Sequence, residues 1–130
     1  MSAESDIRAL FSSYGAGFDD ADPDEVTSLF AWPVTIWQFG KGHVFEGEDE
    51  LSENVDALMD VFDEAGIVST TPEVKDVRIA SSTAFADVVW RQEDDQGELL
   101  HQFSCQYLLL EQEGSWRIAT IVNEDARGDE

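Results

Sequence analysis

The sequence is poor in cysteine and in basic residues, and each shortage narrows what the protein can do. Cys105 is the only cysteine among the 130 residues, so the chain cannot form an intramolecular disulfide. Lysine and arginine together number 7 against 29 acidic residues, which gives a formal net charge of −22. Because nucleic-acid affinity comes largely from basic side chains that neutralise phosphates, we expect no nucleic-acid partner. The same charge disfavours binding to an anionic membrane surface.

Long hydrophobic runs are also missing. No apolar run approaches the length of about 20 residues that a membrane-spanning helix requires. The first residues, MSAESDIRALF, carry acids where a secretory signal has a basic start and an apolar block. Since no disulfide requires an oxidising compartment, these features predict a cytoplasmic protein.

The excess of acidic residues predicts a solvated anionic surface. Such a surface aids solubility, but its charges repel one another in the compact state. A source cell rich in salt would explain the bias, because counterions screen this repulsion. This hypothesis predicts a higher melting temperature in molar potassium chloride than in low salt.

Apolar residues are present in sufficient number for a packed core. Hydrophobic residues make up 42% of the chain and include 4 Trp and 8 Phe. A chain of this length buries about two thirds of the surface that its unfolded form exposes. We therefore predict a single domain that spans residues 1–130.

Hydrophobic spacing predicts a helix near the N-terminus, over residues 5–20. Apolar and aromatic side chains from Ile7 to Phe18 recur at the spacing of one helical face. Gly15 and Gly17 interrupt this helix, and each costs it about 1 kcal/mol relative to alanine. We therefore expect a neighbouring backbone to approach closely at these two glycines.

The rest of the chain predicts two more helices followed by strands. Asp22 and Pro23 form a helix start signal. Gly66 is a typical residue at the end of a helix. The predicted helices cover residues 22–30 and 51–65, and the predicted strands cover residues 32–39, 74–80, 84–93, 98–111 and 116–123. Residues 40–47 are predicted as a turn, with a short second strand at Val44 and Phe45 left open. Pro33 places the first strand at a sheet margin, and residues 125–130 are expected to fray.

The segment YGAGFDDADPDEVTSLF, the closing strand GSWRIATIV and the order of the elements resemble the nuclear transport factor 2-like superfamily. This superfamily includes ketosteroid isomerases, scytalone dehydratase, limonene epoxide hydrolase and SnoaL-like polyketide cyclases. The resemblance covers nearly the whole chain. It implies an α+β fold of the cystatin-like kind, a cone in which a curved, mostly antiparallel sheet wraps around three N-terminal helices, and a homodimer formed through the sheet. Because the cone hosts many unrelated activities, the resemblance predicts a fold and not a reaction.

The resemblance to ketosteroid isomerases implies a role for Tyr14 and argues against one for Gln38. Tyr14 aligns with the tyrosine whose hydroxyl stabilises an oxyanion in those enzymes. Gln38 aligns with their proton-abstracting carboxylate, and an amide cannot act as a general base at neutral pH. Their second oxyanion donor is an aspartic acid on a late strand, whereas residues 101–110, HQFSCQYLLL, contain no acid.

Alternation along the strands predicts the lining of a pocket inside the cone. An apolar wall with few polar groups is typical of a small-molecule site. The aromatic residues could instead fill the cone as ordinary core. The predicted ligand-binding residues are Tyr14, Trp32, Ile36, Gln38, Val88, Trp90, His101, Phe103 and Cys105.

Tyr14 and His101 are the candidate catalytic residues, His101 because imidazole can exchange protons near neutral pH. Cys105 lies four residues further along the same strand. That spacing separates the two side chains by about 13 Å, so we expect no Cys–His nucleophile pair. Cys105 is instead expected to be a small buried apolar residue.

Neither a metal nor an organic cofactor is predicted. His43 and Glu46 form the only local pair that suggests a metal, and a zinc site needs three or four convergent ligands. The acidic residues between Asp49 and Asp63 lack the glycine-containing ligand pattern of a calcium loop. The chain also has no glycine-rich phosphate loop.

Three functions remain open from the sequence. The first is a protein that binds a small apolar or amphipathic molecule without reacting on it, favoured by Gln38 and by the acid-free late strand. The second is an acid–base enzyme of the isomerase, dehydratase, cyclase or hydrolase type that uses Tyr14 and His101. The third is a dimeric protein-interaction scaffold with a filled cone.

Overall fold

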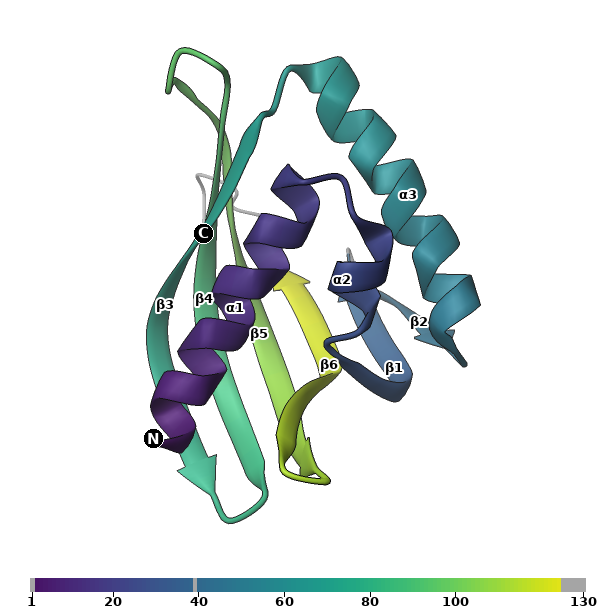
Figure 1. The fold of residues 1–130 in the computed structure, drawn as a ribbon, viewed down its shortest axis with the longest axis vertical. Helices are drawn as coiled ribbons and strands as arrows, with labels where there is room; N and C mark the ends of the chain where they lie inside the picture. Colours follow the sequence, from purple (N-terminus) through teal and green to yellow (C-terminus); the bar gives the residue numbers. More distant parts are fainter. Residues whose placement is uncertain (1, 39, 125–130) are drawn as a thin grey trace.

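The computed structural model describes residues 2–38 and 40–124, which form three helices and six strands. Figure 1 shows their arrangement and labels. The helices are α1 (Ala3–Asp19), α2 (Pro23–Thr27) and α3 (Glu48–Ala65). The strands are β1 (Phe30–Gln38), β2 (Lys41–Phe45), β3 (Ser69–Ala80), β4 (Thr83–Glu93), β5 (Leu99–Gln112) and β6 (Ser115–Glu124). No helix in this part of the chain is both long and apolar enough to cross a membrane.

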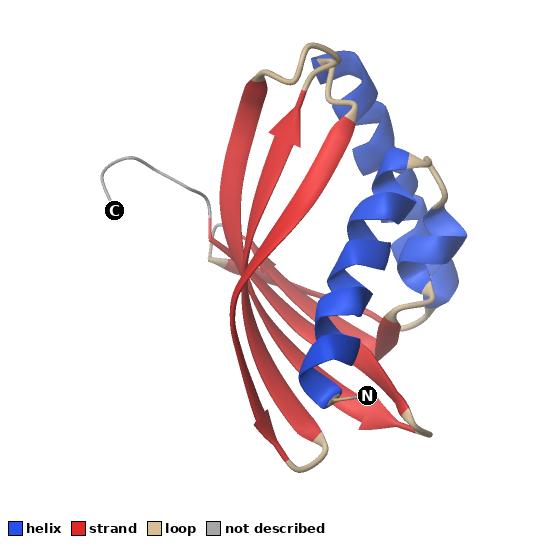
Figure 2. Ribbon diagram, turned by 60° about the vertical axis from the view of Figure 1, so that its left-hand side comes forward, coloured by secondary structure: helices blue, strands red, loops and turns tan. Residues whose placement is uncertain are grey.

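The six strands form one curved sheet in the order β2-β1-β6-β5-β4-β3. Every neighbouring pair is antiparallel except β1 and β6, which run parallel. Figure 2 shows all three helices on the concave side of the sheet. The predicted α+β cone, with a mostly antiparallel sheet around N-terminal helices, is therefore confirmed.

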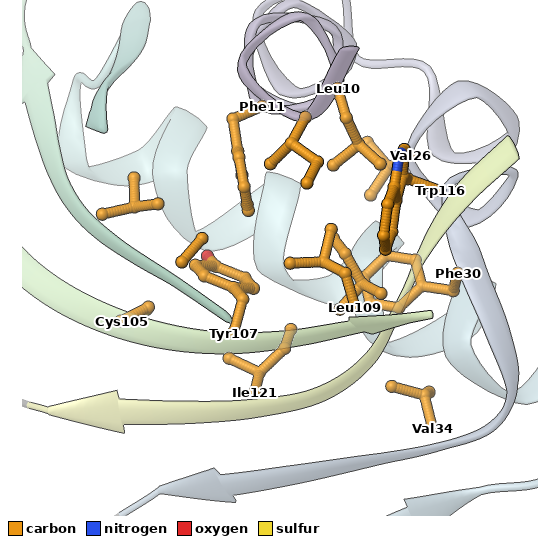
Figure 3. Close-up of a cluster of buried hydrophobic side chains, with 14 of the residues drawn as sticks. Leu10, Phe11, Val26, Phe30, Val34, Cys105, Tyr107, Leu109, Trp116 and Ile121 are labelled. Carbon is orange, nitrogen blue, oxygen red and sulfur yellow. The ribbon is translucent and has the colours of Figure 1, made fainter. Parts of the chain in front are cut away.

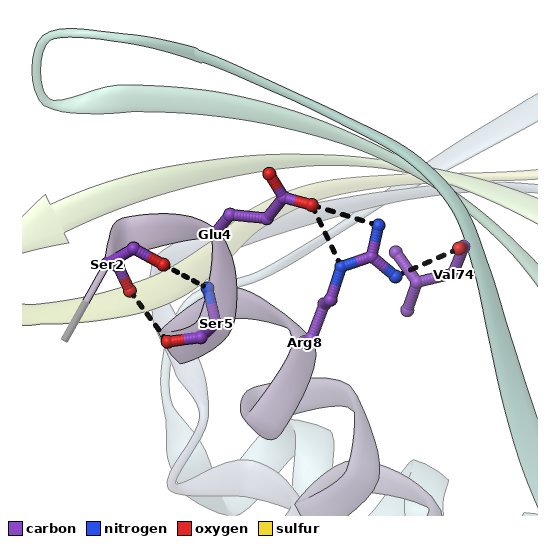
Figure 4. Close-up of polar contacts among 5 residues, drawn as sticks. All are labelled: Ser2, Glu4, Ser5, Arg8 and Val74. Carbon is purple, nitrogen blue, oxygen red and sulfur yellow. Dashed lines mark hydrogen bonds and ion pairs between the residues drawn. The ribbon is translucent and has the colours of Figure 1, made fainter.

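Side-chain contacts fix α1 at its start and hold it against β3. The Ser2 hydroxyl caps the helix by accepting a hydrogen bond of 3.1 Å from the amide of Ser5. Further along, the Arg8 guanidinium donates to Glu4 at 3.1 Å and to the carbonyl of Val74 at 3.2 Å (Figure 4). The bond to Val74 ties the first turns of α1 to the middle of β3.

The two glycines of α1 allow the close approach that the sequence predicts. A Cβ atom on Gly15 would lie 2.6 Å from the carbonyl oxygen of Thr70 in β3. A Cβ atom on Gly17 would lie 2.7 Å from a methyl group of Val26 in α2. Side chains at these positions would therefore push α1 away from both neighbours.

The core fills one end of the space between α1 and the sheet. Figure 3 shows Phe11 of α1 pointing toward Tyr107 of β5, and their ring centroids lie 4.6 Å apart. Trp90 of β4 contacts the same phenylalanine edge-on at 6.5 Å. Aromatic residues therefore do form core at this end of the cone, as one of the two sequence interpretations states.

The start of β3 and the end of α2 differ from the sequence prediction by several residues. The strand β3 begins at Ser69 and not at residue 74, although it contains Pro72. It is an edge strand, where a missing backbone donor is tolerated. The helix α2 ends at Thr27, because the chain enters β1 at Phe30.

The prediction that the first strand lies at a sheet margin is wrong. β1 has β2 on one side and β6 on the other. Pro33 is nevertheless accommodated, because the pairing with β6 is irregular between Phe30 and Thr35. The predicted end of this strand at Phe39 and the predicted tail at residues 125–130 lie outside the described residues.

Candidate functional site

A cavity of about 420 Å³ lies on the inner side of the sheet, with α1 and α3 contributing to its walls. This volume falls within the range of small-molecule sites, roughly 300–1,000 Å³. Apolar and aromatic side chains predominate in the lining. The lining residues are Tyr14, Phe18, Phe30, Ile36, Gln38, Leu51, Asn54, Val55, Ala57, Leu58, Val61, Phe62, Thr70, Trp90, Gln92, His101, Phe103, Cys105, Tyr107, Ile121 and Asn123.

The strand register explains which predicted residues meet in this cavity. Trp90 is paired with Phe103, and Gln38 with Asn123, so inward-facing side chains of β4 and β5, and of β1 and β6, lie side by side. Seven of the nine predicted ligand-binding residues line the cavity: Tyr14, Ile36, Gln38, Trp90, His101, Phe103 and Cys105.

Trp32 and Val88 are not among the lining residues. Val88 faces inward opposite Cys105, but it is completely buried in the core. Trp32 packs against Phe30 with ring centroids 6.2 Å apart, at the irregular start of β1. Each of the two lies on the face of its own strand that the sequence predicts to line the cavity. Alternation alone therefore does not separate core residues from cavity residues.

Tyr14 stands where the core meets the cavity. Its ring stacks on Phe18 at 5.5 Å and is tilted against Trp90 at 5.2 Å. Burial raises the pKa of Tyr14, and the nearby Cys105 raises it further. The hydroxyl is therefore a neutral group near pH 7, able to donate a hydrogen bond. It has no hydrogen-bond partner among the residues that the structure describes.

Trp90 and Tyr107 are joined beneath the cavity. The indole nitrogen of Trp90 donates a hydrogen bond of 2.8 Å to the Tyr107 hydroxyl. Burial, followed by the proximity of Cys105 and Tyr14, raises the pKa of Tyr107 well above its ordinary value. Both aromatic side chains thus form a fixed, neutral wall.

Cys105 and His101 do not form a pair. On the neighbouring strand, His101 lies opposite Gln92, whereas Cys105 lies opposite Val88. Burial raises the pKa of Cys105 to about 12, despite an opposing contribution from Tyr107. The thiol is therefore protonated at neutral pH and is a poor nucleophile.

Gln92 and His101 form the main polar contact of the cavity wall. Oε1 of Gln92 lies 3.1 Å from Nδ1 of His101. The Gln92 side chain is only 1% exposed, and its amide nitrogen has no hydrogen-bond partner within residues 2–38 and 40–124. His101, by contrast, is exposed. The pair thus runs from the buried wall to the open side of the site.

The apolar face of α3 contributes side chains that remain exposed. Leu58 is 38% exposed and Val61 57% exposed, although both line the cavity. Phe62 of the same helix contacts Phe18 of α1 at 5.6 Å. The helix therefore contacts α1 at this aromatic pair and packs Leu51 and Val55 into the core, while Leu58 and Val61 remain exposed.

Some lining residues were not predicted from the sequence. Gln92 follows Ala86, Val88 and Trp90 in the same alternation, so a polar residue on an apolar face was a usable signal. Asn54 gives no comparable signal, because polar residues are common on a helix that is exposed on one side. Thr70 belongs to the part of β3 that the sequence prediction left out.

The described lining carries no carboxylate, ammonium or guanidinium group. Within the described part of the chain, no Asp, Glu, Lys or Arg lines the cavity. The same residues contain no group of three or more His, Cys, Asp or Glu side chains that could hold a metal ion. The cavity is therefore a neutral space inside a protein of net charge −22.

A family model described as "NTF2-like protein (DUF6841)" matches residues 3–126. This match confirms the superfamily that the sequence resembles. No curated protein matches the sequence.

Solved structures with the same fold include three informative examples. An NTF-2 like protein of unknown function from Shewanella oneidensis is 14% identical, with a TM-score of 0.75 over 95% of this chain and 100% of the other. A domain of unknown function with a cystatin-like fold from Nostoc punctiforme is 21% identical, with a TM-score of 0.78 over 98% and 80%. A ketosteroid isomerase-like protein from Erwinia carotovora is 21% identical, with a TM-score of 0.70 over 95% and 95%. At these identities the likeness establishes the fold alone.

Proposed function

We propose that this chain, which belongs to the NTF2-like protein family (DUF6841), binds a small uncharged amphipathic molecule in its cavity. The molecule lies between the concave face of the sheet and α3. Its apolar part contacts the aromatic and aliphatic wall, and its polar part lies among the neutral polar side chains. Binding of this kind needs no catalytic carboxylate, in keeping with Gln38 on the cavity wall.

The exposed apolar side chains of α3 carry this proposal. Leu58 and Val61 are 38% and 57% exposed while facing a cavity that the protein itself leaves open. Covering apolar surface contributes about 25 cal/mol for each Å² removed from water. An apolar ligand would remove this surface from water, and it would fill the space between α3 and the sheet.

The charge distribution supports an uncharged ligand. An anion would be repelled by the net charge of −22 and would find no Lys or Arg side chain on the described cavity wall. A cation would leave water without a carboxylate partner in the lining, which is costly in a largely apolar site. A neutral molecule avoids both costs.

A substitution that fills the cavity tests the proposal. Val61→Trp places an indole into the cavity from an exposed position, so it removes little packing. Val44→Trp is the matched control, because Val44 is 53% exposed and does not line the cavity. The probe is Nile red, an uncharged apolar dye whose emission shifts to the blue when it leaves water.

We expect Nile red to bind the wild type and Val44→Trp equally, and Val61→Trp at least about tenfold more weakly, a loss of about 1.4 kcal/mol. Native mass spectra of the freshly purified proteins should show any retained molecule on the first two and not on the third. Equal dye binding by all three proteins, or none by the wild type, would contradict the proposal.

A second candidate function is acid–base catalysis on such a molecule. The observation that favours it is the contact of His101 Nδ1 with Gln92 at 3.1 Å, which leaves Nε2 of the ring available as a base. Tyr14 would donate a hydrogen bond to the oxygen on which charge develops. Proton NMR in D₂O tests it with 2-acetylnaphthalene: its methyl protons should exchange faster with the wild type than with His101→Ala.

A further inference from the structure

Among the described residues, Nε2 of Gln92 is the one side-chain nitrogen or oxygen atom that is fully enclosed and has no hydrogen-bond partner. The Gln92 side chain is 1% exposed. A buried donor that makes no hydrogen bond costs free energy, and native proteins rarely leave one without a reason. Gln92 also lines the cavity, so a bound molecule could supply the missing acceptor.

Neither residue opposite Gln92 in the sheet makes a hydrogen bond to this donor. Thr70 lies opposite Gln92 on β3, but its amide is a donor that already bonds the Asp19 carboxylate at 2.7 Å. On β5 the residue opposite is His101, whose Nδ1 is engaged by Oε1 of the same amide. The amide is therefore held by its oxygen, while its nitrogen stays free to bond a further group.

The contact with Gln92 also sets the hydrogen-bonding character of His101. An amide oxygen can only accept, so Nδ1 of His101 carries the hydrogen. In the neutral imidazole the other nitrogen, Nε2, is then an acceptor. The pair thus offers one donor, on Gln92, and one acceptor, on His101.

We propose that Gln92 and His101 bind the polar end of the cavity ligand, with Gln92 Nε2 donating to a carbonyl or hydroxyl oxygen and His101 Nε2 accepting from a ligand hydroxyl. This inference rests on the proposed function and names the ligand class: an uncharged molecule with an apolar body and a carbonyl or hydroxyl end. The last torsion of a glutamine side chain is soft. Rotation about it turns Nε2 toward the ligand and moves Oε1 through the same angle, so the proposal requires a rotation small enough to keep Oε1 within reach of His101.

Three uncharged probes that share one skeleton test this assignment. The ketone 2-acetylnaphthalene offers an acceptor, and the alcohol 1-(2-naphthyl)ethanol offers an acceptor and a donor. The hydrocarbon 2-isopropenylnaphthalene has nearly the same shape and offers neither. Each dissociation constant is measured by displacement of Nile red from the wild-type protein and from the variants.

The decisive variant is Gln92→Met, which keeps the length of the side chain and removes the amide. The matched control is Gln102→Met, because Gln102 lies on the opposite face of β5 and bonds Arg91 at 2.9 Å. The measured quantity is the preference for ketone over hydrocarbon, the ratio of their two dissociation constants. Each probe loses the same water whichever protein it binds, so the desolvation of the probes cancels when this ratio is compared between proteins. We expect Gln92→Met to reduce this preference by about fivefold or more, and Gln102→Met to leave it unchanged.

His101→Phe tests the acceptor separately. It should reduce the preference for alcohol over ketone and leave the preference for ketone over hydrocarbon in place. Thermal melts establish that each variant is folded. Gln92→Leu serves as a second variant at this position if Gln92→Met melts early.

The outcomes separate this inference from the proposed function. If the probes bind but Gln92→Met keeps the full ketone preference, the assignment of Gln92 is wrong while ligand binding in the cavity stands. If His101→Phe leaves the alcohol preference unchanged, the assignment of His101 is wrong. If no probe displaces Nile red and the dye itself does not bind, the proposed function fails and this inference fails with it.

Discussion

The indole nitrogen of Trp90 donates a hydrogen bond of 2.8 Å to the hydroxyl of Tyr107. Both side chains are almost completely buried, and they come from the neighbouring strands β4 and β5. Tyr107 also contacts Phe11 edge-on at 4.6 Å. One polar contact thus fixes the orientation of the two aromatic side chains that separate the core from the cavity.

Tyr107→Phe should lower the free energy of unfolding by about 1–3 kcal/mol, because it leaves the buried Trp90 N–H without an acceptor. Urea denaturation followed by tryptophan fluorescence measures the change. Tyr14→Phe is the matched control: its hydroxyl bonds no other described residue, so its removal should cost less than about 1 kcal/mol. Equal losses in the two variants would contradict the role assigned to this bond.

Gly15→Ala should destabilise the protein although alanine favours a helix. The helix propensity gained is about 1 kcal/mol. The new Cβ atom would lie 2.6 Å from the backbone oxygen of Thr70, which cannot move without shifting β3. Overpacking of this kind costs about 1–3 kcal/mol, so we expect a net loss. Ala16→Gly, at an exposed position of the same helix, calibrates the propensity contribution in the same urea titration.

The fold was predictable because local signals and the resemblance agree. The helices cover the periodic apolar residues. Their boundaries agree with two local signals, the capping aspartate before Pro23 and Gly66 at the end of α3. The first part of β3 was missed because Ser69 to Pro72 resembles a loop. This segment lies at the sheet edge, which makes Pro72 acceptable. The edge position depends on the tertiary structure, so no local sequence pattern predicts it.

The cavity was less predictable than the sheet that bears it. Alternation places Val88 and Trp90 on one face, yet Val88 is core while Trp90 also lines the cavity. The difference depends on which helix covers each residue, and that depends on the whole fold. The Gln92–His101 contact joins residues nine positions apart through strand register, so only the pairing of β4 with β5 reveals it.

Asp19 should make the protein lose stability as pH rises through the pKa of its carboxyl group. Burial raises the pKa of Asp19, while the hydrogen bond from Thr70 lowers it and Asp20 raises it again. Because the net shift is upward, the folded state binds the proton more tightly than the unfolded state. This contribution is present at pH values below the ordinary pKa and is lost as pH rises through the folded pKa.

Asp19→Asn removes this titration and keeps an oxygen that can accept from Thr70. The free energy of unfolding of the wild type minus that of Asp19→Asn should therefore fall as pH rises from about 3.5 to 7. Asp19→Ala also removes the acceptor and should be less stable than Asp19→Asn by about 1 kcal/mol at every pH. A difference between wild type and Asp19→Asn that grows with pH would show that the sign is wrong.

The outer face of the sheet carries exposed apolar side chains, and we propose that it pairs with a second copy of the chain. Phe85 lies opposite Leu108, and Trp37 lies opposite Val122, all four on the face away from the helices. Two chains of net charge −22 repel each other, so an interface must form where uncharged residues predominate. On the central strands the uncharged Ser104, Gln106 and Thr120 lie between the apolar residues, and Gln106 donates a hydrogen bond of 3.4 Å to Asp87, a carboxylate on this face.

Leu108→Asp should weaken this dimer by at least about tenfold, because it buries an unpaired carboxylate at the centre of the interface. Val68→Asp, at an exposed position outside the strands, should leave the dimer unchanged. Sedimentation equilibrium measures the dimer affinity of the wild type and both variants. Runs at 0.1 M and 1 M potassium chloride, where the Debye length is about 10 Å and about 3 Å, measure the salt response. Added salt should tighten the wild-type dimer, since it screens the repulsion between the two anionic surfaces. A monomeric wild type at both concentrations would contradict the pairing and would leave the apolar outer face to some other partner.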